Sequence, residues 1–242
     1  MSLFKELCFL FRGQTPTSIY PKFFASKIKY KKLKKRYRTE IAEFQSFIKK
    51  ENFNRDWFSW NASVWLDIFD NYNLRSRPIR ALEIGSFEGL SACFLLQQLP
   101  QAHLTCVDTW EGSDEHKGLD IIKSTENEFD RHVAPWKTRV HKVKGTSHAF
   151  FANTNNDLYF DFIYIDGSHH ADDVIADALM GFERLQVGGV MIFDDYLWNY
   201  YPRASENPIS AINSFLRITE GRHKVSFLNY QVVVIKTAIR SS

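Results

Sequence analysis

The stretch DFIYIDGSHHADDVIADALMGFERLQVGGVMIFDDY, residues 161–196, decides the fold of this chain. Two short apolar runs, residues 162–165 and 190–193, flank a segment from 171 to 185 that has the length and apolar spacing of one helix. A Gly188-Gly189 turn is expected after this helix. A short buried strand, a helix and a second buried strand predict a βαβ unit with parallel strands.

Carboxylates follow both apolar runs of this unit. Asp166 comes after the first run, and Asp194 and Asp195 come after the second. Because the crossover of such a unit is right-handed, both strands should end at the same edge of the sheet. Ligands of open α/β sheets bind outside that edge. With His169 close to Asp166, the stretch predicts a divalent-metal site with a neighbouring base.

The composition is that of an ordinary globular protein. The 242 residues are 44% hydrophobic and 24% charged, and the net charge of +3 is too small to indicate a nucleic-acid partner, so none is expected. Three scattered cysteines argue against a disulfide framework or a zinc site. The first residues make a poor signal peptide, and no apolar run is long enough to span a bilayer, so we expect a cytoplasmic protein.

Residues 1–50 are predicted to form a basic helical extension, with the main domain in residues 51–242. Lysines and arginines crowd residues 27–38, and residues 41–50 have the apolar spacing of an amphipathic helix. Such an extension can pack on its own domain, on a second subunit of a homo-oligomer or another protein, or on a membrane surface. The sequence leaves these alternatives open.

A strand, a glycine loop and a helix open the main sheet. The strand at Ile79–Ile84 contains Glu83, the loop GSFEG includes Gly85, Ser86 and Gly89, and a helix is expected over residues 90–99. Glycines in such a loop let the backbone approach a ligand closely. The spacing is G-x-x-x-G rather than the G-x-G-x-x-G that admits a pyrophosphate. The acidic residue before the loop therefore favours a cation-bearing ligand without phosphate.

The next two strands end beside the same expected site. The strand over residues 103–108 ends on Asp108, where Rossmann-like folds hold ribose hydroxyls. Thr109 and Trp110 follow, and the indole is a candidate to pack against an adenine. The third strand, residues 139–144, is followed by Ser147, a candidate for the adenine edge. The segments 110–135 and 197–208 are expected to contact the substrate.

Other elements complete the expected fold. Residues 57–72 predict a helix whose tryptophan-rich stripe faces the core. Two strands over 223–228 and 231–236 are joined only by Asn229-Tyr230, which predicts an antiparallel hairpin. The sequence thus predicts an α/β fold, a Rossmann-like seven-stranded sheet of five parallel strands plus a C-terminal antiparallel hairpin, with helices on both faces.

These motifs resemble the class I S-adenosylmethionine-dependent methyltransferases. EIGSFEG is similar to the first motif of that family, and CVDTW is similar to the second. IDGSH together with GGVMIFDDY resembles the metal-dependent O-methyltransferases of the macrocin O-methyltransferase-like group, which modify sugar and macrolide hydroxyls. The resemblance covers residues 57–236.

The resemblance implies a role for each matching residue. S-adenosylmethionine would be held by Glu83, Gly85, Ser86, Gly89, Asp108, Thr109, Trp110, Ser147 and Asp166. Mg²⁺ would be held by Asp166, Asp194 and Asp195, and His169 would be the general base. Some members of the group have an aspartate as base at the position of Ser168, and a serine cannot serve that way.

The expected reaction is metal-assisted O-methylation of a hydroxyl on a sugar, glycan or secondary metabolite. Two alternatives remain open at this point. One is a metal-independent methyltransferase acting on an amine or carboxyl acceptor, and the other is a non-catalytic, cofactor-binding interaction module. Neighbouring residues of a strand point to opposite faces, so Asp194 and Asp195 can both bind a metal only if the strand ends before them.

Overall fold

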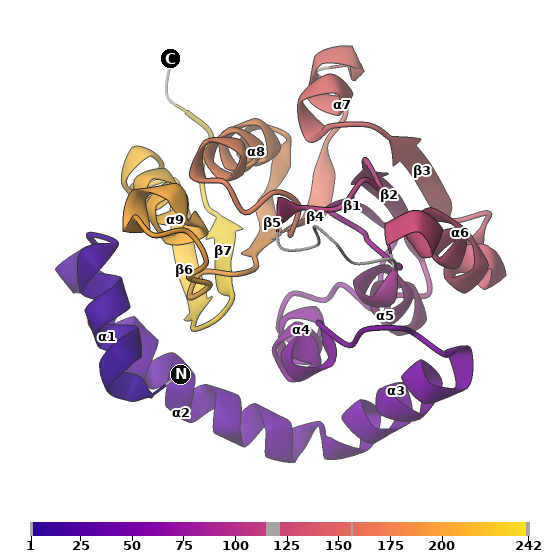
Figure 1. Cartoon of the computed structure of the whole chain (residues 1–242), viewed down its shortest axis with the longest axis horizontal. Helices are drawn as coiled ribbons and strands as arrows, with labels where there is room; N and C mark the ends of the chain where they lie inside the picture. Colours follow the sequence, from indigo (N-terminus) through magenta and orange to yellow (C-terminus); the bar gives the residue numbers. More distant parts are fainter. Residues whose placement is uncertain (1, 115–121, 156, 241–242) are drawn as a thin grey trace. The chain divides into compact units, whose positions relative to one another are not determined.

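The computed structural model describes residues 2–114, 122–155 and 157–240, in which helices and strands alternate along most of the chain (Figure 1). The strands are β1 (Ile79–Ile84), β2 (Ala102–Asp108), β3 (Val140–Lys144), β4 (Phe160–Ile165), β5 (Leu185–Phe193), β6 (His223–Leu228) and β7 (Val232–Lys236). The helices are α1 (Leu3–Arg12), α2 (Tyr20–Arg36), α3 (Arg38–Glu51), α4 (Ala62–Asn71), α5 (Leu90–Gln98), α6 (Ile122–Val133), α7 (Ser147–Asn153), α8 (Ala171–Glu183) and α9 (Pro208–Ile218). The predicted substrate segment 110–135 is described except for residues 115–121.

The strands form a seven-stranded sheet in the order β3-β2-β1-β4-β5-β7-β6. β2 pairs in parallel with β1 and with β3, and β4 pairs in parallel with β5. β7 runs antiparallel to both of its neighbours, β5 and β6. The predicted Rossmann-like sheet with a terminal antiparallel hairpin is therefore confirmed.

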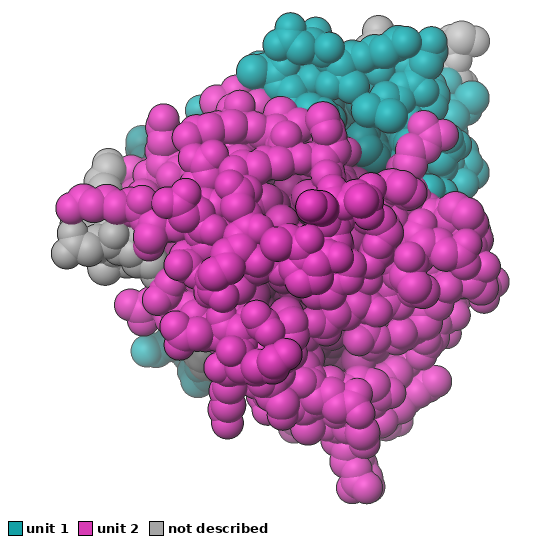
Figure 2. Space-filling view, turned by 90° about the vertical axis from the view of Figure 1, so that its right-hand side faces the viewer, with its two compact units in different colours: residues 1–27, 147–242 teal, residues 28–146 magenta. Residues whose placement is uncertain are grey.

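The chain divides into two compact units, coloured separately in Figure 2. Unit 1 contains residues 1–27 and 147–242, and unit 2 contains residues 28–146. Helix α2 crosses from one unit to the other. The boundary at residue 50 that the sequence suggests stays a prediction.

Unit 2 is built on the parallel strands β1, β2 and β3. Its core is aromatic, because Phe94 of α5 packs against Phe58 and against Trp65 and Phe69 of α4. The predicted core stripe of residues 57–72 is therefore correct for Trp65 and its neighbours. It is wrong for Trp57 and Trp60, which are 42% and 40% exposed because they precede the first turn of α4.

Unit 1 is built on β4, β5 and the hairpin of β6 and β7. Helices α8 and α9 lie side by side, and the Phe215 ring of α9 packs on Phe182 of α8 and on Phe193 of β5 (Figure 1). The predicted Gly188-Gly189 turn is wrong, because both glycines lie within β5. Gly188 has a φ of 85°, and the register between β4 and β5 shifts at this point. The glycines thus form a bulge in the strand.

Along the described parts of the chain, we find no helix that is both long enough and apolar enough to cross a lipid bilayer.

Candidate active site

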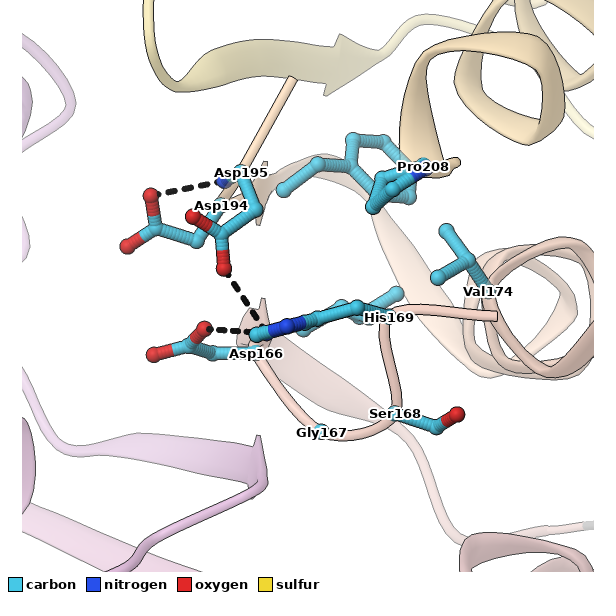
Figure 3. Close-up of a pocket in the computed structure, with 10 residues that line it drawn as sticks. Asp166, Gly167, Ser168, His169, Val174, Asp194, Asp195 and Pro208 are labelled. Atoms are coloured by element: carbon cyan, nitrogen blue, oxygen red, sulfur yellow. Dashed lines mark hydrogen bonds and ion pairs between the residues drawn. The ribbon is translucent and has the colours of Figure 1, made fainter. Parts of the chain in front are cut away.

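Three side chains of unit 1 converge where β4 and β5 end (Figure 3). Asp166 follows β4 directly, Asp195 lies two residues beyond β5, and His169 lies in the turn that leads to α8. Ligand atoms of these three residues lie within 4.8 Å of one another. We call Asp166, His169 and Asp195 the Asp–His cluster. The pocket around it is also lined by Val174 and Pro208.

Asp195 reaches the cluster because the backbone turns sharply after β5. The strand ends at Phe193, so the alternation of side chains along a strand no longer applies to the two aspartates. Asp195 has a φ of 58°, a left-handed conformation that aspartate adopts more readily than most residues. Its Oδ2 lies 2.8 Å from Nε2 of His169, and Asp166 Oδ1 lies 3.9 Å from the same nitrogen.

Asp194 is engaged in a different set of contacts. It is 7% exposed, and its Oδ1 accepts a hydrogen bond from the backbone N–H of Asp195 at 2.8 Å. Its Oδ2 accepts from the amide of Gln231 at 2.9 Å and contacts the hydroxyl of Tyr164. The hydroxyl oxygen of Tyr164 also lies 2.8 Å from Oδ2 of Asp166. Tyr164 therefore joins the carboxylates that follow β4 and β5.

Burial and the neighbouring charges shift the pKa values of three groups in the site. Burial raises the pKa of Asp166 to about 6, although the hydrogen bond from His169 works against this rise. Burial by itself would lower the pKa of His169, but hydrogen bonds to Asp166 and Asp195 and their charges outweigh it and hold this pKa well above its usual value. Burial and the two neighbouring carboxylates raise the pKa of Tyr164, so its hydroxyl stays a proton donor.

Two neighbours of His169, Ser168 and Trp198, make different contacts. The hydroxyl of Ser168 accepts a hydrogen bond from the backbone N–H of His170 at the start of α8, and it points away from the cluster (Figure 3). The ring of Trp198 packs edge-on against the imidazole of His169, with 4.5 Å between ring centres. Trp198 stacks in turn on Tyr200, which is 54% exposed. An aromatic surface therefore borders the base candidate.

The glycine loop of unit 2 is held by Asp108. The Oδ2 of Asp108 accepts hydrogen bonds from the backbone N–H groups of Ser86 and Phe87, each at 2.8 Å. Its Oδ1 accepts from the N–H of Trp110 at 2.6 Å. A carboxylate has about four acceptor positions, so one remains for a ligand hydroxyl. Gly89 is the N-cap residue directly before α5 and has a φ of 83°, which a glycine at the end of a tight loop adopts readily.

The other predicted cofactor residues lie in varied surroundings. Glu83 is 2% exposed and accepts a hydrogen bond from the hydroxyl of Ser91 at 2.6 Å. Trp110 is 6% exposed, its indole N–H donates to the backbone oxygen of Phe87, and its ring packs on Phe129. Gly85 has a φ of 85°, which suits the turn at the end of β1.

Two further predicted residues, Thr109 and Ser147, are partly exposed. The hydroxyl of Thr109 accepts from the backbone N–H of Glu111 at 3.2 Å. Ser147 begins α7 and hydrogen-bonds with Asp177. The roles of all these residues toward a cofactor stay predictions.

Sequence reasoning missed Tyr164 and Gln231, and it included Trp198 only as part of the predicted substrate segment 197–208. Tyr164 had a signal, because it lies two positions before Asp166 and so shares its face of the strand. Gln231 had none, because it comes from the distant hairpin between β6 and β7.

Comparisons with known proteins agree with this fold. Residues 82–196 match a family model described as a methyltransferase domain. The chain is 27% identical over 140 residues to the O-methyltransferase hkm8 of Aspergillus hancockii, which covers 56% of this chain and 51% of that protein. The chain thus spans about half the length of this curated relative.

Solved structures of methyltransferases share the fold. The O-methyltransferase TomG from Streptomyces achromogenes, in complex with SAM, matches with a TM-score of 0.55 and 15% identity over 83% of this chain and 90% of its own. The MycE methyltransferase of the mycinamycin pathway, in complex with Mg, SAH and mycinamycin VI, matches with a TM-score of 0.57 and 18% identity over 84% of this chain and 57% of its own. The chain shares the Rossmann-like fold of these methyltransferases, and residues 82–196, which include most of the predicted motifs, match the methyltransferase-domain model.

Proposed function

We propose that this protein transfers the methyl group of S-adenosylmethionine to a hydroxyl oxygen of a sugar, glycan or secondary metabolite, with the help of a divalent cation. The observation that carries the proposal is the Asp–His cluster, which places two carboxylates and an imidazole within 4.8 Å of one another. The similar proteins support the proposal. Two of them, hkm8 and TomG, are O-methyltransferases, and MycE is a methyltransferase whose structure contains Mg and SAH.

The donor set of the cluster suits Mg²⁺. Mg²⁺ prefers oxygen ligands, keeps several waters and is commonly held by only one or two carboxylates. Asp166 and Asp195 supply those carboxylates, and Asp194 stays a predicted third ligand. A divalent cation held there would lower the pKa of a substrate hydroxyl and keep it in place.

His169 is the group that takes the proton of the acceptor hydroxyl. Its Nε2 faces the two carboxylates of the cluster (Figure 3). The ring of Trp198 packs edge-on against the imidazole and restricts its movement. The carboxylates raise the pKa of His169, and a divalent cation that neutralised them would bring it back toward the range in which an imidazole accepts a proton near neutral pH. Trp198 and Tyr200 offer an apolar surface for the ring of an acceptor, because sugars and aromatic metabolites both pack on aromatic side chains.

Asp108 orders the glycine loop and has one acceptor position left for a ribose hydroxyl. S-adenosylmethionine supplies the methyl group when it is bound. The loop contains no lysine and has the spacing of a phosphate-free ligand site, in agreement with that cofactor.

Isothermal titration calorimetry tests the two binding sites separately. S-adenosylhomocysteine should bind the wild type, and Asp108→Ala should weaken it at least 100-fold, whereas the exposed Asp157→Ala should not. Mg²⁺ should bind the wild type, and Asp195→Asn should weaken it at least tenfold while Asp173→Asn, at the exposed start of α8, leaves it unchanged.

A transfer assay with labelled S-adenosylmethionine and a panel of glycosides and hydroxylated metabolites then tests the reaction. Transfer that EDTA abolishes is expected. Full transfer in EDTA would favour the metal-independent alternative, and failure to bind S-adenosylhomocysteine would contradict the whole proposal.

A further inference from the structure

Helix α1 presents an apolar face to solvent. Leu3, Phe4 and Phe11 are 47%, 76% and 79% exposed, and Cys8 is exposed as well. With the half-buried Leu7, these residues recur at spacings of three and four and so occupy one side of the helix. We call this side the apolar face of α1. Large aromatic side chains that are mostly exposed and lie next to one another mark an interaction site.

The opposite side of α1 is firmly seated in unit 1. Phe9 and Leu10 are 3% and 0% exposed, and Glu6 forms an ion pair with Lys27 at 2.6 Å. The amide of Asn213 donates to the backbone oxygen of Gly13 at 2.9 Å, directly after the helix. The apolar face is therefore held outward by a packed helix, and is not the surface of a loose segment.

The same part of the chain has a strong positive charge. Residues 1–39 contain eleven lysines and arginines and one acidic residue, whereas residues 40–242 contain 20 basic and 27 acidic residues. Lys5 and Arg12 border the apolar face of α1. Helix α2 repeats the combination on its own surface, where the exposed Phe24 and Ile28 are followed at helical spacing by the exposed Lys31 and Lys35.

This positive charge favours one binding partner of the apolar face over the alternatives. A second copy of the chain would bring two strongly basic segments together, and their repulsion opposes that contact. A nucleic acid would use the lysines and could stack on Phe4 and Phe11, but it would leave the aliphatic side chains without a partner. An anionic lipid surface accepts all of these groups, because apolar side chains enter the acyl boundary and lysines bind the headgroups.

We propose that the apolar face of α1, together with the positive charge of residues 1–39, docks this protein on an anionic lipid surface. Phe4 and Phe11 enter the boundary between headgroups and acyl chains, and the lysines of α2 attract the negative headgroups. The contact is peripheral, with α1 lying in the plane of the surface.

Vesicle sedimentation with the full-length protein tests this proposal. Mixed phosphatidylcholine–phosphatidylglycerol vesicles should bind the wild type, and pure phosphatidylcholine vesicles should bind it much more weakly. Phe4→Ser with Phe11→Ser should lower the partition coefficient at least tenfold, because two apolar rings no longer leave water. Lys31→Gln, Lys32→Gln and Lys35→Gln together should lower it by about fivefold for each lysine that reaches the surface.

Matched controls use exposed residues of the same kinds elsewhere. Val187→Ser with Ile218→Ser removes two exposed apolar side chains, and Lys49→Gln, Lys137→Gln and Lys224→Gln remove three exposed charges. Neither set should change vesicle binding, and S-adenosylhomocysteine affinity should stay the same in all variants. The proposal is overturned if the wild type does not bind the anionic vesicles, or if the control sets weaken binding as much as the α1 and α2 sets. Tight binding of an RNA oligonucleotide with no vesicle binding would also overturn it.

Discussion

A single phenol joins the two carboxylates that follow β4 and β5. The hydroxyl of Tyr164 contacts both Asp166 and Asp194, but it has only one hydrogen to donate. Asp194 is further held by Gln231 and by the backbone of Asp195. These contacts fix the orientation of the Asp166 side chain and of the backbone at Asp195.

Tyr164→Phe should destabilise the protein and loosen the cluster. Removal of the hydroxyl takes away the one donor that Asp166 and Asp194 share, which costs about 1–3 kcal/mol. Thermal unfolding should show this loss, and calorimetry should show weaker Mg²⁺ binding. The control is Tyr159→Phe, whose ring is 39% exposed. Equal unfolding temperatures for both variants would contradict the proposed positioning role.

Asp177 makes the stability of unit 1 depend on pH. This carboxyl on α8 is 3% exposed, and its Oδ1 has no hydrogen-bond partner among the described residues. Burial, with a further contribution from the charge of Asp173, raises its pKa from 3.8 to about 6, although a hydrogen bond with Ser147 works against this. The folded protein thus binds this proton more tightly than the unfolded chain does, so stability falls as the pH rises from about 4 to 6.

Asp177→Asn should therefore raise the free energy of unfolding above pH 6. The gain is at most about 3 kcal/mol, because a shift of two pKa units corresponds to that energy. It should vanish near pH 3.5, where the wild-type carboxyl is protonated in both states. Urea unfolding at the two pH values measures the difference, with the exposed Asp157→Asn as control. A gain that does not change with pH would show that charge is not its cause.

At the scale of elements, Asn207 holds the aromatic segment beside the cluster. Its side chain is fully buried, accepts hydrogen bonds from the N–H groups of Tyr200 and Tyr201, and donates to the backbone oxygens of Tyr201 and Arg203. The segment has no regular secondary structure between Tyr196 and the short helix Ala204–Glu206. The side-chain amide of Asn207 therefore supplies backbone hydrogen bonds of the kind that a neighbouring strand supplies in a sheet.

Asn207→Ala should release the aromatic segment without unfolding the sheet. Hydrogen–deuterium exchange of residues 197–207 should become faster, while exchange of β4 and β5 stays slow. Asn199→Ala, an exposed asparagine in the same segment, should change neither. Protection that is the same in both variants would argue against this role of Asn207.

The elements of the sheet were predictable because buried parallel strands appear as apolar runs with clear ends. The predicted bounds of β1 agree with the structure, and those of β2 and β3 differ by one residue at the start. The bulge at Gly188 was not predictable, because two glycines indicate a turn as readily as a bulge. At the site, Asp166, His169 and Asp195 were found from their places after strands. Gln231 and the contact of Trp198 with His169 were missed because only the packed fold brings them close.

At the scale of the whole molecule, the two ends of the sequence meet in unit 1. The amide of Asn213 donates to the hydroxyl of Thr15 at 3.0 Å, and the hydroxyl of Tyr196 donates to Asn213 Oδ1 at 2.8 Å. The hydroxyls of Thr15 and Tyr196 lie 3.1 Å apart and close the ring of hydrogen bonds. All three residues are buried, so each depends on the other two.

Thr15→Val should lower the melting temperature of the full-length protein. The change keeps the shape of the side chain but removes the acceptor of one buried N–H of Asn213 and one partner of the Tyr196 hydroxyl, at a cost of about 1–3 kcal/mol. For a chain of this size each kcal/mol corresponds to about 2–4 °C. Calorimetry measures the shift, and the exposed Thr17→Val is the control. An unchanged melting temperature would mean that the ring contributes little.

The same ring has a consequence for the order of events on the ribosome. Thr15 precedes Tyr196 by 181 positions and Asn213 by 198. At about 5–20 residues per second, these partners are synthesised roughly 10–40 s after Thr15. During that time the buried hydroxyl of Thr15 lacks the two hydrogen-bond partners that it has in the finished protein. The turn that follows α1 therefore gains these hydrogen bonds only after most of the described chain has been synthesised.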